Sequence, residues 1–494
     1  MGGTRPAAVL GLCLFFSAGS ATALTDEEIF RGFQFSFLNP GARTLGMGGA
    51  AVAGVSDGTA ARANPAGLRY VTQPEFFAEF RGFDRDTEIF GSELGSLEVD
   101  PLTGNRELPF LGLTSVSNPV SANELNFVSV VWPFELGAAK RRLTLSASRE
   151  VILADERALE EYSDITELRL AFDSFPNTVN GGQVEAYSIA GPVRGHVDTE
   201  IVYLNLGASI DLHRDFSVGV TVSDASLDLR ASTLTRIEDP LALTVDPTHP
   251  RLGMQPTTDV FRTSIDDSDS DLAYTVGVHW HPDSVFASGP SAFRLGAVFH
   301  RGVSFDVTEE MTLNGLDDGT LDVGVIVPDR YSVGASYQTR GRWNFAAELE
   351  RIEYSDMLEG YQAGVNFLTS GRIVDTLAAI DPNETVTYDV DDGNVIRVGA
   401  EYVLPLNSGS GSRLAFRGGY FRTPDNRIRM TQFNSTDPAI NDVYLDAFRG
   451  GEDEDHVTVG AGFELRMASI QVAAEFSSAG WQIVESVVFR LGNK

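Results

Sequence analysis

The sequence predicts an all-β fold: a 14-stranded antiparallel transmembrane β-barrel with a small helical N-terminal hatch inside its lumen. Three observations lead to this prediction. Many segments of about ten residues alternate between apolar and polar side chains, and short connections alternate with long ones along the chain. After residue 23, no apolar run approaches the roughly 18 residues of a membrane helix. If the chain lies in a membrane, it therefore crosses with strands.

The first 23 residues have the layout of a secretory signal peptide. Arg5 precedes an apolar run over residues 7–16, and small residues end the segment at Ala21-Thr22-Ala23. Cys13 lies inside the run, but the bulky Leu12 before it argues against a lipoprotein signal. Cleavage after Ala23 leaves a chain without cysteine, which is typical of an exported protein without disulfides.

Residues 24–74 do not alternate, and they form the predicted hatch. Thr25 and Glu28 have the spacing of a capping box, and residues 41–55 are mostly small, which allows backbones to approach closely. The Asn64-Pro65-Ala66-Gly67 stretch predicts a turn before the first strand. Because this segment is too small to hold its own core, we expect it to plug the barrel formed by residues 75–494.

Alternating segments follow from residue 75 onward, and an even number of them returns both chain ends to the periplasmic side. A phase change around Asp224-Ala225 predicts a β-bulge. The turn at His213-Arg214-Asp215 predicts a hairpin, as does the turn at Ala468-Ser469. The predicted strands are 75–83, 110–118, 125–134, 199–212, 215–230, 271–281, 292–308, 329–338, 342–353, 394–404, 413–422, 455–467, 469–478 and 481–491.

The polar face of these strands carries charged residues such as Glu348, Arg397 and Glu401. A soluble β-sandwich would explain that face equally well. The apolar face, however, holds large side chains on nearly every strand, with aromatic residues near strand ends, where membrane barrels have aromatic girdles. Together with the signal peptide, this favours a monomer surrounded by lipid in the outer membrane of a Gram-negative bacterium.

The composition excludes several functions. With 37 basic and 69 acidic residues, the formal net charge of -32 has the wrong sign for neutralising phosphates, so no nucleic-acid partner is expected. A hydrolase would need a serine, a histidine and an acid brought together, and we expect no G-x-S-x-G elbow that marks a nucleophile. We therefore expect no enzyme activity and no cofactor.

Two sets of residues could hold a cation, although we expect neither to do so. His279 and His281 lie two apart on one strand and face the lumen together, but without a third ligand a solvated pair is expected. The acidic runs 266–271 and 452–455 could hold Ca²⁺ between loops, yet neither has EF-hand spacing. Solvated external loops are expected for both runs, and no metal ligand is predicted.

Three stretches near the N-terminus resemble the outer-membrane long-chain fatty acid and hydrocarbon transporters, the FadL/TodX-like barrels. Weaker likeness continues in Val327-Pro328-Asp329 and in later strands such as 397–402. The stretches that carry the resemblance are Gly32-Phe33-Gln34-Phe35, Gly46-Met47-Gly48-Gly49-Ala50 and Asn64-Pro65-Ala66-Gly67-Leu68.

The resemblance implies passive uptake. A fatty acid or another hydrophobic compound would be caught outside, enter an apolar pocket and leave sideways into the membrane. It implies that Phe33 and Phe35 bind the ligand and that the hatch residues Gly32, Asn64, Pro65, Ala66 and Gly67 take part in gating. For the lateral opening, Pro133 is the candidate, because proline cannot donate a ladder hydrogen bond.

Two features depart from the family. After the expected cleavage site, several residues precede the Gly32-Phe33 stretch, and a long insert spans residues 135–198. Within the insert, residues 155–172 predict a helix that caps the barrel or forms an apolar groove. An alternative function is that of related barrels that act as scaffolds for exported proteins in secretion. These share the second and third stretches, whereas the Gly32-Phe33-Gln34-Phe35 stretch favours transport.

Overall fold

The computed structural model describes the chain from Phe35 to Gly492 with several gaps. The expected signal peptide, the Thr25–Glu28 pair, Gly32 and Phe33 lie outside the described residues. The described residues are 35, 37–99, 106–137, 141–158, 168–176, 183–190, 194–239, 243–244, 253–254, 257–282, 293–339, 341–359, 385–406, 411–434 and 450–492.

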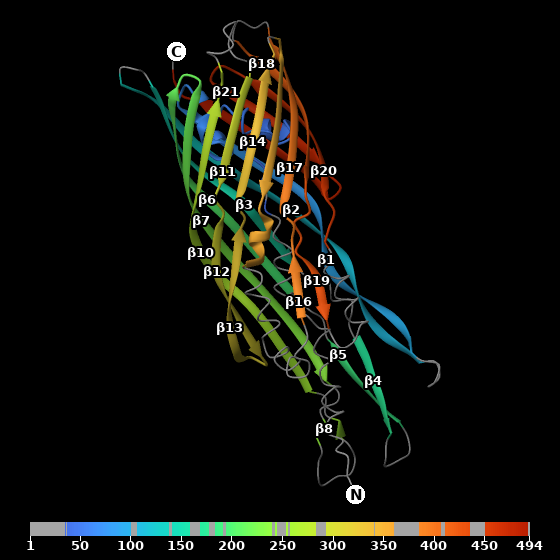
Figure 1. The fold of residues 1–494 in the computed structure, drawn as a ribbon. Helices are drawn as coiled ribbons and strands as arrows, with labels where there is room; N and C mark the ends of the chain where they lie inside the picture. The colour runs from blue at the N-terminus through green and yellow to red at the C-terminus, as the bar shows by residue number, and fades with distance from the viewer. Residues whose placement is uncertain are drawn as a thin grey trace.

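Fourteen antiparallel strands close into a barrel within the described part of the chain (Figure 1), which confirms the predicted fold class. Each strand pairs with the next, and the last pairs with the first through a register from Glu75↔Arg490 to Arg85↔Gly480. The wall strands are β1 (Glu75–Val99), β2 (Arg106–Leu136), β3 (Arg141–Ala158), β6 (Arg194–His213), β7 (Phe216–Asp239), β10 (Thr257–Trp280), β11 (Phe293–His300), β14 (Arg330–Gln338), β15 (Trp343–Ile352), β17 (Gly393–Pro405), β18 (Arg413–Thr423), β20 (Glu454–Glu464), β21 (Ala468–Phe476) and β22 (Gly480–Arg490).

The predicted strand count agrees with the structure, but two errors cancel. The predicted strands 110–118 and 125–134 both belong to β2, which pairs with β1 along most of its length. In exchange, β3 was not predicted as a strand, although it pairs with β2 and β6. The predicted helix over 155–172 is wrong wherever it is described, because residues 155–158 end β3 and residues 168–172 lie in another strand.

Further strands extend or border the wall. β12 (Val303–Leu313) and β13 (Leu316–Val327) form a hairpin that continues β11 and β14 beyond short breaks. Two more hairpin-like pairs and one short pair lie toward the same end: β4 (Leu168–Pro176) with β5 (Gln183–Ala190), β16 (Thr385–Asp389) with β19 (Arg429–Asn434), and β8 (Leu243–Thr244) with β9 (Gly253–Met254).

The hatch lies inside the opposite end of the barrel, where the connections are short (Figure 1). It contains α3 (Ala42–Gly46), α4 (Ala60–Ala63) and the 3-10 helix η1 (Pro65–Tyr70), joined by turns. A further 3-10 helix, η3 (Tyr354–Asp356), follows β15. Among the residues that the structure describes, no helix has the length and apolarity that crossing a membrane requires.

The wall has two levels with opposite polarity, and β7 shows both. In its first half, Val218, Val220 and Val222 lie on the outer face, while Ser217, Thr221 and Ser223 face the interior. In its second half the outer face carries Asp224, Asp228 and Arg230, and the inner face carries Ala225, Leu227 and Leu229. We call the first level the lower barrel and the second the upper barrel.

No bulge accompanies this change. The register of β7 against β6 and β10 runs without a shift through Asp224 and Ala225, and odd-numbered residues point inward throughout. The predicted bulge is therefore wrong. What changes at this level is the surroundings: an apolar outer face suits lipid, whereas a polar outer face suits water.

Candidate binding site in the barrel interior

Asn64 fastens the hatch to the wall from a fully buried position. Its Oδ1 accepts a hydrogen bond from the Ala66 N–H (3.1 Å), which caps η1. Its Nδ2 donates to the Val52 carbonyl at 2.9 Å and to the Val278 carbonyl of β10 at 3.1 Å. The predicted hatch residues Pro65, Ala66 and Gly67 are buried beside it. One side chain thus joins two parts of the hatch and the wall.

The wall approaches this turn closely because it presents glycines there. A Cβ on Gly219 would lie 2.3 Å from the Pro65 carbonyl carbon, and one on Gly277 would lie 2.1 Å from Asn64 Oδ1. The Ala66 carbonyl accepts a hydrogen bond from the Ser217 hydroxyl at 3.0 Å. The turn is therefore seated in a depression that only small wall residues allow.

The glycine-rich stretch 46–50 is anchored in a similar way on the opposite wall. Gly48 has a φ of 66°, and its amide donates to Thr458 Oγ1 of β20 at 3.2 Å. Beside it, Glu348 Oε2 accepts from the amides of Ala51 (2.8 Å) and Val52 (2.9 Å). Because wall side chains satisfy hatch amides at several places, moving the hatch would leave buried donors without partners.

A layer of buried charges lies between the hatch and the upper barrel, and we call it the charge layer. Arg62 pairs with Glu150 (Nε to Oε2, 2.6 Å). Arg397 bridges two carboxylates, Glu348 at 3.0 Å and Glu350 at 2.5 Å. The sixth member is Arg330, whose Nη1 lies 3.0 Å from Glu350 Oε1. With three cations and three anions, the layer is balanced.

Above the charge layer, the barrel encloses an apolar cluster that we call the upper interior. Its members come from the segment before the hatch, from the wall strands β3, β6, β7, β10, β15 and β17, and from β12, β13 and β16. Its members include Phe35, Phe37, Ile152, Ile201, Tyr203, Leu227, Leu229, Ile265, Val303, Phe305, Val307, Val325, Ile352, Tyr354, Tyr388 and Val395.

Phe35 and Phe37 reach this cluster from the segment before the hatch. Their rings stack with centroids 5.6 Å apart, and Phe37 lies 6.4 Å from the Tyr354 ring. The Arg330 guanidinium lies 4.5 Å from the Phe37 ring centre, which places Phe37 on the floor of the upper interior. Burial raises the pKa of the Tyr354 phenol, so its hydroxyl stays neutral at physiological pH.

Of the residues predicted to bind ligand, Phe35 is therefore described and lies in the upper interior, whereas Phe33 lies outside the described residues. Pro133, the predicted lateral opening, pairs with Thr144 in a β2–β3 ladder that continues without a register shift to Leu136. On its other side, the β1 ladder begins at Val131. Pro133 thus lies at the short-turn end of the wall, far from the upper interior.

The predicted lumen pair His279 and His281 points inward and is buried. His279 is engaged by the hatch through both ring nitrogens, with the Ala53 carbonyl at 3.1 Å and the Tyr70 hydroxyl at 3.2 Å. No group of three metal-ligating side chains occurs among the described residues. Gly54-Val55-Ser56-Asp57-Gly58 has the spacing of a G-x-S-x-G motif, but it forms a turn of the hatch and follows no strand.

The acidic run 266–271 is not a loop, in contrast to the prediction, because it lies within β10. Its side chains are nevertheless mostly exposed. In the second run, residues 452–453 precede β20 and residues 454–455 begin it.

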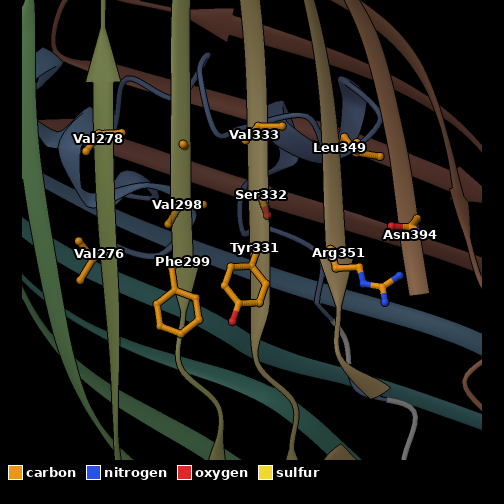
Figure 2. A pocket seen from close by; sticks show the side chains of 11 residues that line it. Val276, Val278, Val298, Phe299, Tyr331, Ser332, Val333, Leu349, Arg351 and Asn394 are labelled. Atoms are coloured by element: carbon orange, nitrogen blue, oxygen red, sulfur yellow. The ribbon is translucent and has the colours of Figure 1, made fainter. Parts of the chain in front are cut away.

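The outer face of the wall carries a shallow groove of about 450 Å³. Figure 2 shows its lining on β10, β11, β14, β15 and β17, with the hatch behind the strands on the opposite side of the wall. Most of the lining side chains are apolar, among them Val276, Val278, Phe299, Tyr331, Val333 and Leu349. An apolar groove on the outer face of the lower barrel is suited to contact with lipid.

Sequence reasoning missed the partners within the charge layer and the role of the segment after β15. Glu348 and Arg397 were placed on the inner face, but the sequence does not tell which charges meet. Tyr354 and Met357 belong to the upper interior although no alternation marks them. The large aromatic residue Tyr354, four positions after the inward-facing Glu350, was the available signal.

No protein-family model matches the chain, and neither does any curated protein. Among solved structures, the chain is similar to a Pseudomonas aeruginosa FadL homologue, with 15% identity, a TM-score of 0.48, and coverage of 92% of this chain and 98% of that one. It is also similar to the Ralstonia pickettii toluene transporter TbuX, with 13% identity, a TM-score of 0.47, and coverage of 92% of this chain and 100% of that one. A third similar structure is that of the P. putida toluene transporter TodX, with 13% identity, a TM-score of 0.49, and coverage of 93% of this chain and 100% of that one. These structures are of the family that the sequence resemblance names.

Proposed function

We propose that this chain is an outer-membrane channel that takes up hydrophobic compounds passively and binds them in the upper interior. The exchange of polarity between the two levels of one continuous wall carries this proposal. The upper barrel holds its apolar residues inside, where a hydrophobic solute arriving from water gains free energy by losing contact with the solvent. The lower barrel holds them outside, where they contact lipid.

Within this class, the charge layer favours uncharged compounds over fatty acids. A bound carboxylate needs a cation that is not already neutralised, because an unpaired buried charge is costly. Arg62, Arg330 and Arg397 each have glutamate partners within 3.0 Å. A hydrocarbon or another neutral solute needs no free cation at the floor of the upper interior.

Release sideways into the membrane is part of the proposal, because the hatch obstructs the direct route. A solute that passed straight down would have to cross the charge layer and displace a hatch whose amides are bound by Glu348, Glu75 and Thr458. A route through the wall avoids both barriers. No chemical step is needed, and we propose no enzyme activity.

The test begins with the protein purified in detergent from an outer-membrane fraction. Bound compounds are extracted and identified by mass spectrometry, and radiolabelled hexadecane and oleate are then titrated in parallel. Stoichiometric binding of hexadecane, with weaker oleate binding, is the expected result. An interior that binds neither, together with a stoichiometric protein partner, would instead favour the scaffold function in secretion.

A further inference from the structure

Three buried hydroxyl groups in the upper interior have no hydrogen-bond partner, and the first is that of Thr199 on β6. Thr199 is 1% exposed, and its Oγ1 is buried without a partner among the described residues. Alternate residues of a strand share one face, so Thr199 points inward together with Val197, Ile201 and Tyr203, which all belong to the upper interior. A threonine hydroxyl is thus enclosed in apolar surroundings.

The other two hydroxyls belong to Tyr203 on β6 and Tyr354 in η3. Both side chains are members of the apolar cluster, with exposed fractions of 4% and 5%. No hydrogen bond joins either phenol oxygen to another residue that the structure describes. Buried tyrosines usually have such a partner, because the O–H group gives up its water on burial. We call Thr199, Tyr203 and Tyr354 the hydroxyl set.

The two tyrosines stand on the charge layer. The Arg62 guanidinium carbon lies 5.7 Å from the centre of the Tyr203 ring. The Tyr354 ring lies 6.4 Å from that of Phe37, which itself rests on Arg330. The Arg330 charge also interacts electrostatically with both phenols, so both lie around one cation. These contacts hold the rings in place and leave the hydroxyl groups unbonded.

Inner-wall hydroxyls of the lower barrel show what such groups do when a partner is present. Ser217, Thr221 and Ser336 donate to hatch carbonyls at 3.0, 2.7 and 3.0 Å. The wall therefore uses hydroxyl groups to bind what fills the barrel. By the same reasoning, the hydroxyl set is suited to bind whatever fills the upper interior.

Two lower hydroxyls without partners differ from the hydroxyl set in their packing. Ser129 and Ser146 are buried without a hydrogen-bond partner among the described residues. A Cβ on Gly58 would lie 2.3 Å from the Ser129 oxygen, and one on Gly207 would lie 2.3 Å from the Ser146 oxygen. Surfaces in such close contact leave no room for a ligand. The hydroxyl set instead lines the compartment in which the solute is proposed to bind.

We propose that the hydroxyl set binds an oxygen atom of the solute, so that the channel prefers neutral hydrophobic compounds with one hydroxyl group, such as long-chain alcohols, to plain hydrocarbons. This proposal rests on the proposed function and narrows its substrate class. The tyrosine hydroxyls donate to the oxygen of the solute, and the Thr199 oxygen offers an acceptor.

The preference follows from the cost of a buried polar group without a partner. A hydrocarbon in the upper interior leaves the hydroxyl set unbonded, whereas an alcohol supplies the missing partner. Sites that hydrogen-bond an oxygen of their ligand discriminate against the analogue that lacks it. A carboxylate could accept the same hydrogen bonds, but its charge would be buried above cations that are already paired.

The test compares two ligands that differ by one oxygen atom, hexadecane and 1-hexadecanol. Their Kd values are measured with the purified protein in one detergent, before and after the double substitution Tyr203→Phe and Tyr354→Phe, which keeps both rings. We expect the double variant to bind 1-hexadecanol about tenfold more weakly, because up to two hydrogen bonds are lost. The Kd for hexadecane should stay within about twofold, which also shows that the variant is folded.

Single substitutions extend the comparison. Thr199→Val removes the third hydroxyl at nearly constant volume and should weaken 1-hexadecanol binding about threefold. Thr144→Val is the matched control, because it removes a buried hydroxyl without a partner that lies outside the upper interior. Tyr331→Phe is the control for the tyrosines, since its ring is exposed on the outer face. Both controls should leave both Kd values unchanged.

The outcomes separate this inference from the proposed function. If the double variant binds 1-hexadecanol as tightly as the unsubstituted protein does, or loses affinity for both ligands equally, the hydroxyl set does not recognise an oxygen and the inference is overturned. Hexadecane binding by the unsubstituted protein would then still support the channel. If the unsubstituted protein binds neither ligand, the proposed function fails, and this inference fails with it.

Discussion

The lower and upper barrels are built from the same strands, yet each places its apolar side chains on the opposite face. In β7 the inward positions change from Ser217, Thr221 and Ser223 to Leu227 and Leu229 without any change of register. The alternation of side chains along a strand therefore shows that its two faces differ, but it does not show which face points into the barrel and which points outward. That depends on what each face contacts. The lower inner face meets hatch amides that need polar partners, and the upper inner face meets an apolar cluster. The outer face suits lipid below and water above.

The charge layer divides the two levels, and removing its central cation should have the largest effect. Arg397→Ala leaves the buried Glu348 without a cation and Glu350 with Arg330 alone, so we expect a loss of about 3–5 kcal/mol in the free energy of unfolding. Urea unfolding in lipid vesicles measures it. As a control, Arg422→Ala removes the exposed pair with Asp453 and should cost at most about 1 kcal/mol. Equal losses would mean that the layer does not separate the levels.

The boundary of the membrane can be tested on one face of one strand. Val220→Arg places a charge on the outer face of the lower barrel and should cost about 2–4 kcal/mol if that position lies deep in the bilayer. Asp228→Arg lies eight residues further along the same face and should change the stability by about 0.5 kcal/mol or less. The same vesicle unfolding measurement compares them. Similar effects at both positions would remove the distinction between the two outer faces.

The floor of the upper interior should affect binding more than folding. Phe37→Ala removes a buried ring of the kind that contributes about 1.5–3 kcal/mol on burial, so the Kd for hexadecane should rise roughly tenfold. Phe416→Ala, on the lipid-facing side, should leave the Kd unchanged. Phe33→Ala tests the remaining predicted ligand contact in the same titration, and an unchanged Kd in a folded variant would remove that residue from the site.

The smallest effect is expected at Pro133. Pro133→Val restores an amide donor at the short-turn end of the wall, where β2 and β3 already pair through this position. Because Pro133 lies at the short-turn end and not beside the upper interior, hexadecane uptake should stay within about twofold of the unsubstituted protein. A strong reduction in uptake would favour the lateral opening that the resemblance suggested at Pro133.

Much of the fold could be predicted because alternation and connection length depend on local sequence. The errors fall on β2 and β3. β2 was divided around Asn118-Pro119, which has the character of a turn, although the strand continues through it to pair with Thr87 and Asp86. β3 falls in the region read as an insert, where the charged and apolar residues after Asp155 suggested a helix.

The candidate site could be predicted only in part. The hatch stretches and the inner position of Glu348, Arg397 and the two histidines follow from motif and parity. The pairing of charges does not, because Arg62 meets Glu150 only when the hatch is seated against the wall, and Arg330 meets Glu350 only through the register of β14 with β15. The acidic run 266–271 was misread for a similar reason, because such a run suggests a solvated loop and only the pairing of β10 with β7 shows that it lies within a strand.

The closure between β1 and β22 has a consequence for how the chain reaches this state. The Ala42 amide of the hatch donates to Ser486 of the last strand, 444 residues away, and Leu491 N–H bonds to the Pro74 carbonyl. Contacts of such high sequence separation form slowly, because a long loop must be ordered before they stabilise anything. Until the C-terminal strand arrives, both sheet edges and part of the hatch lack partners. Assembly is therefore a late, all-or-none step, and a chain that stops before β22 is left with two open edges available for pairing with other chains.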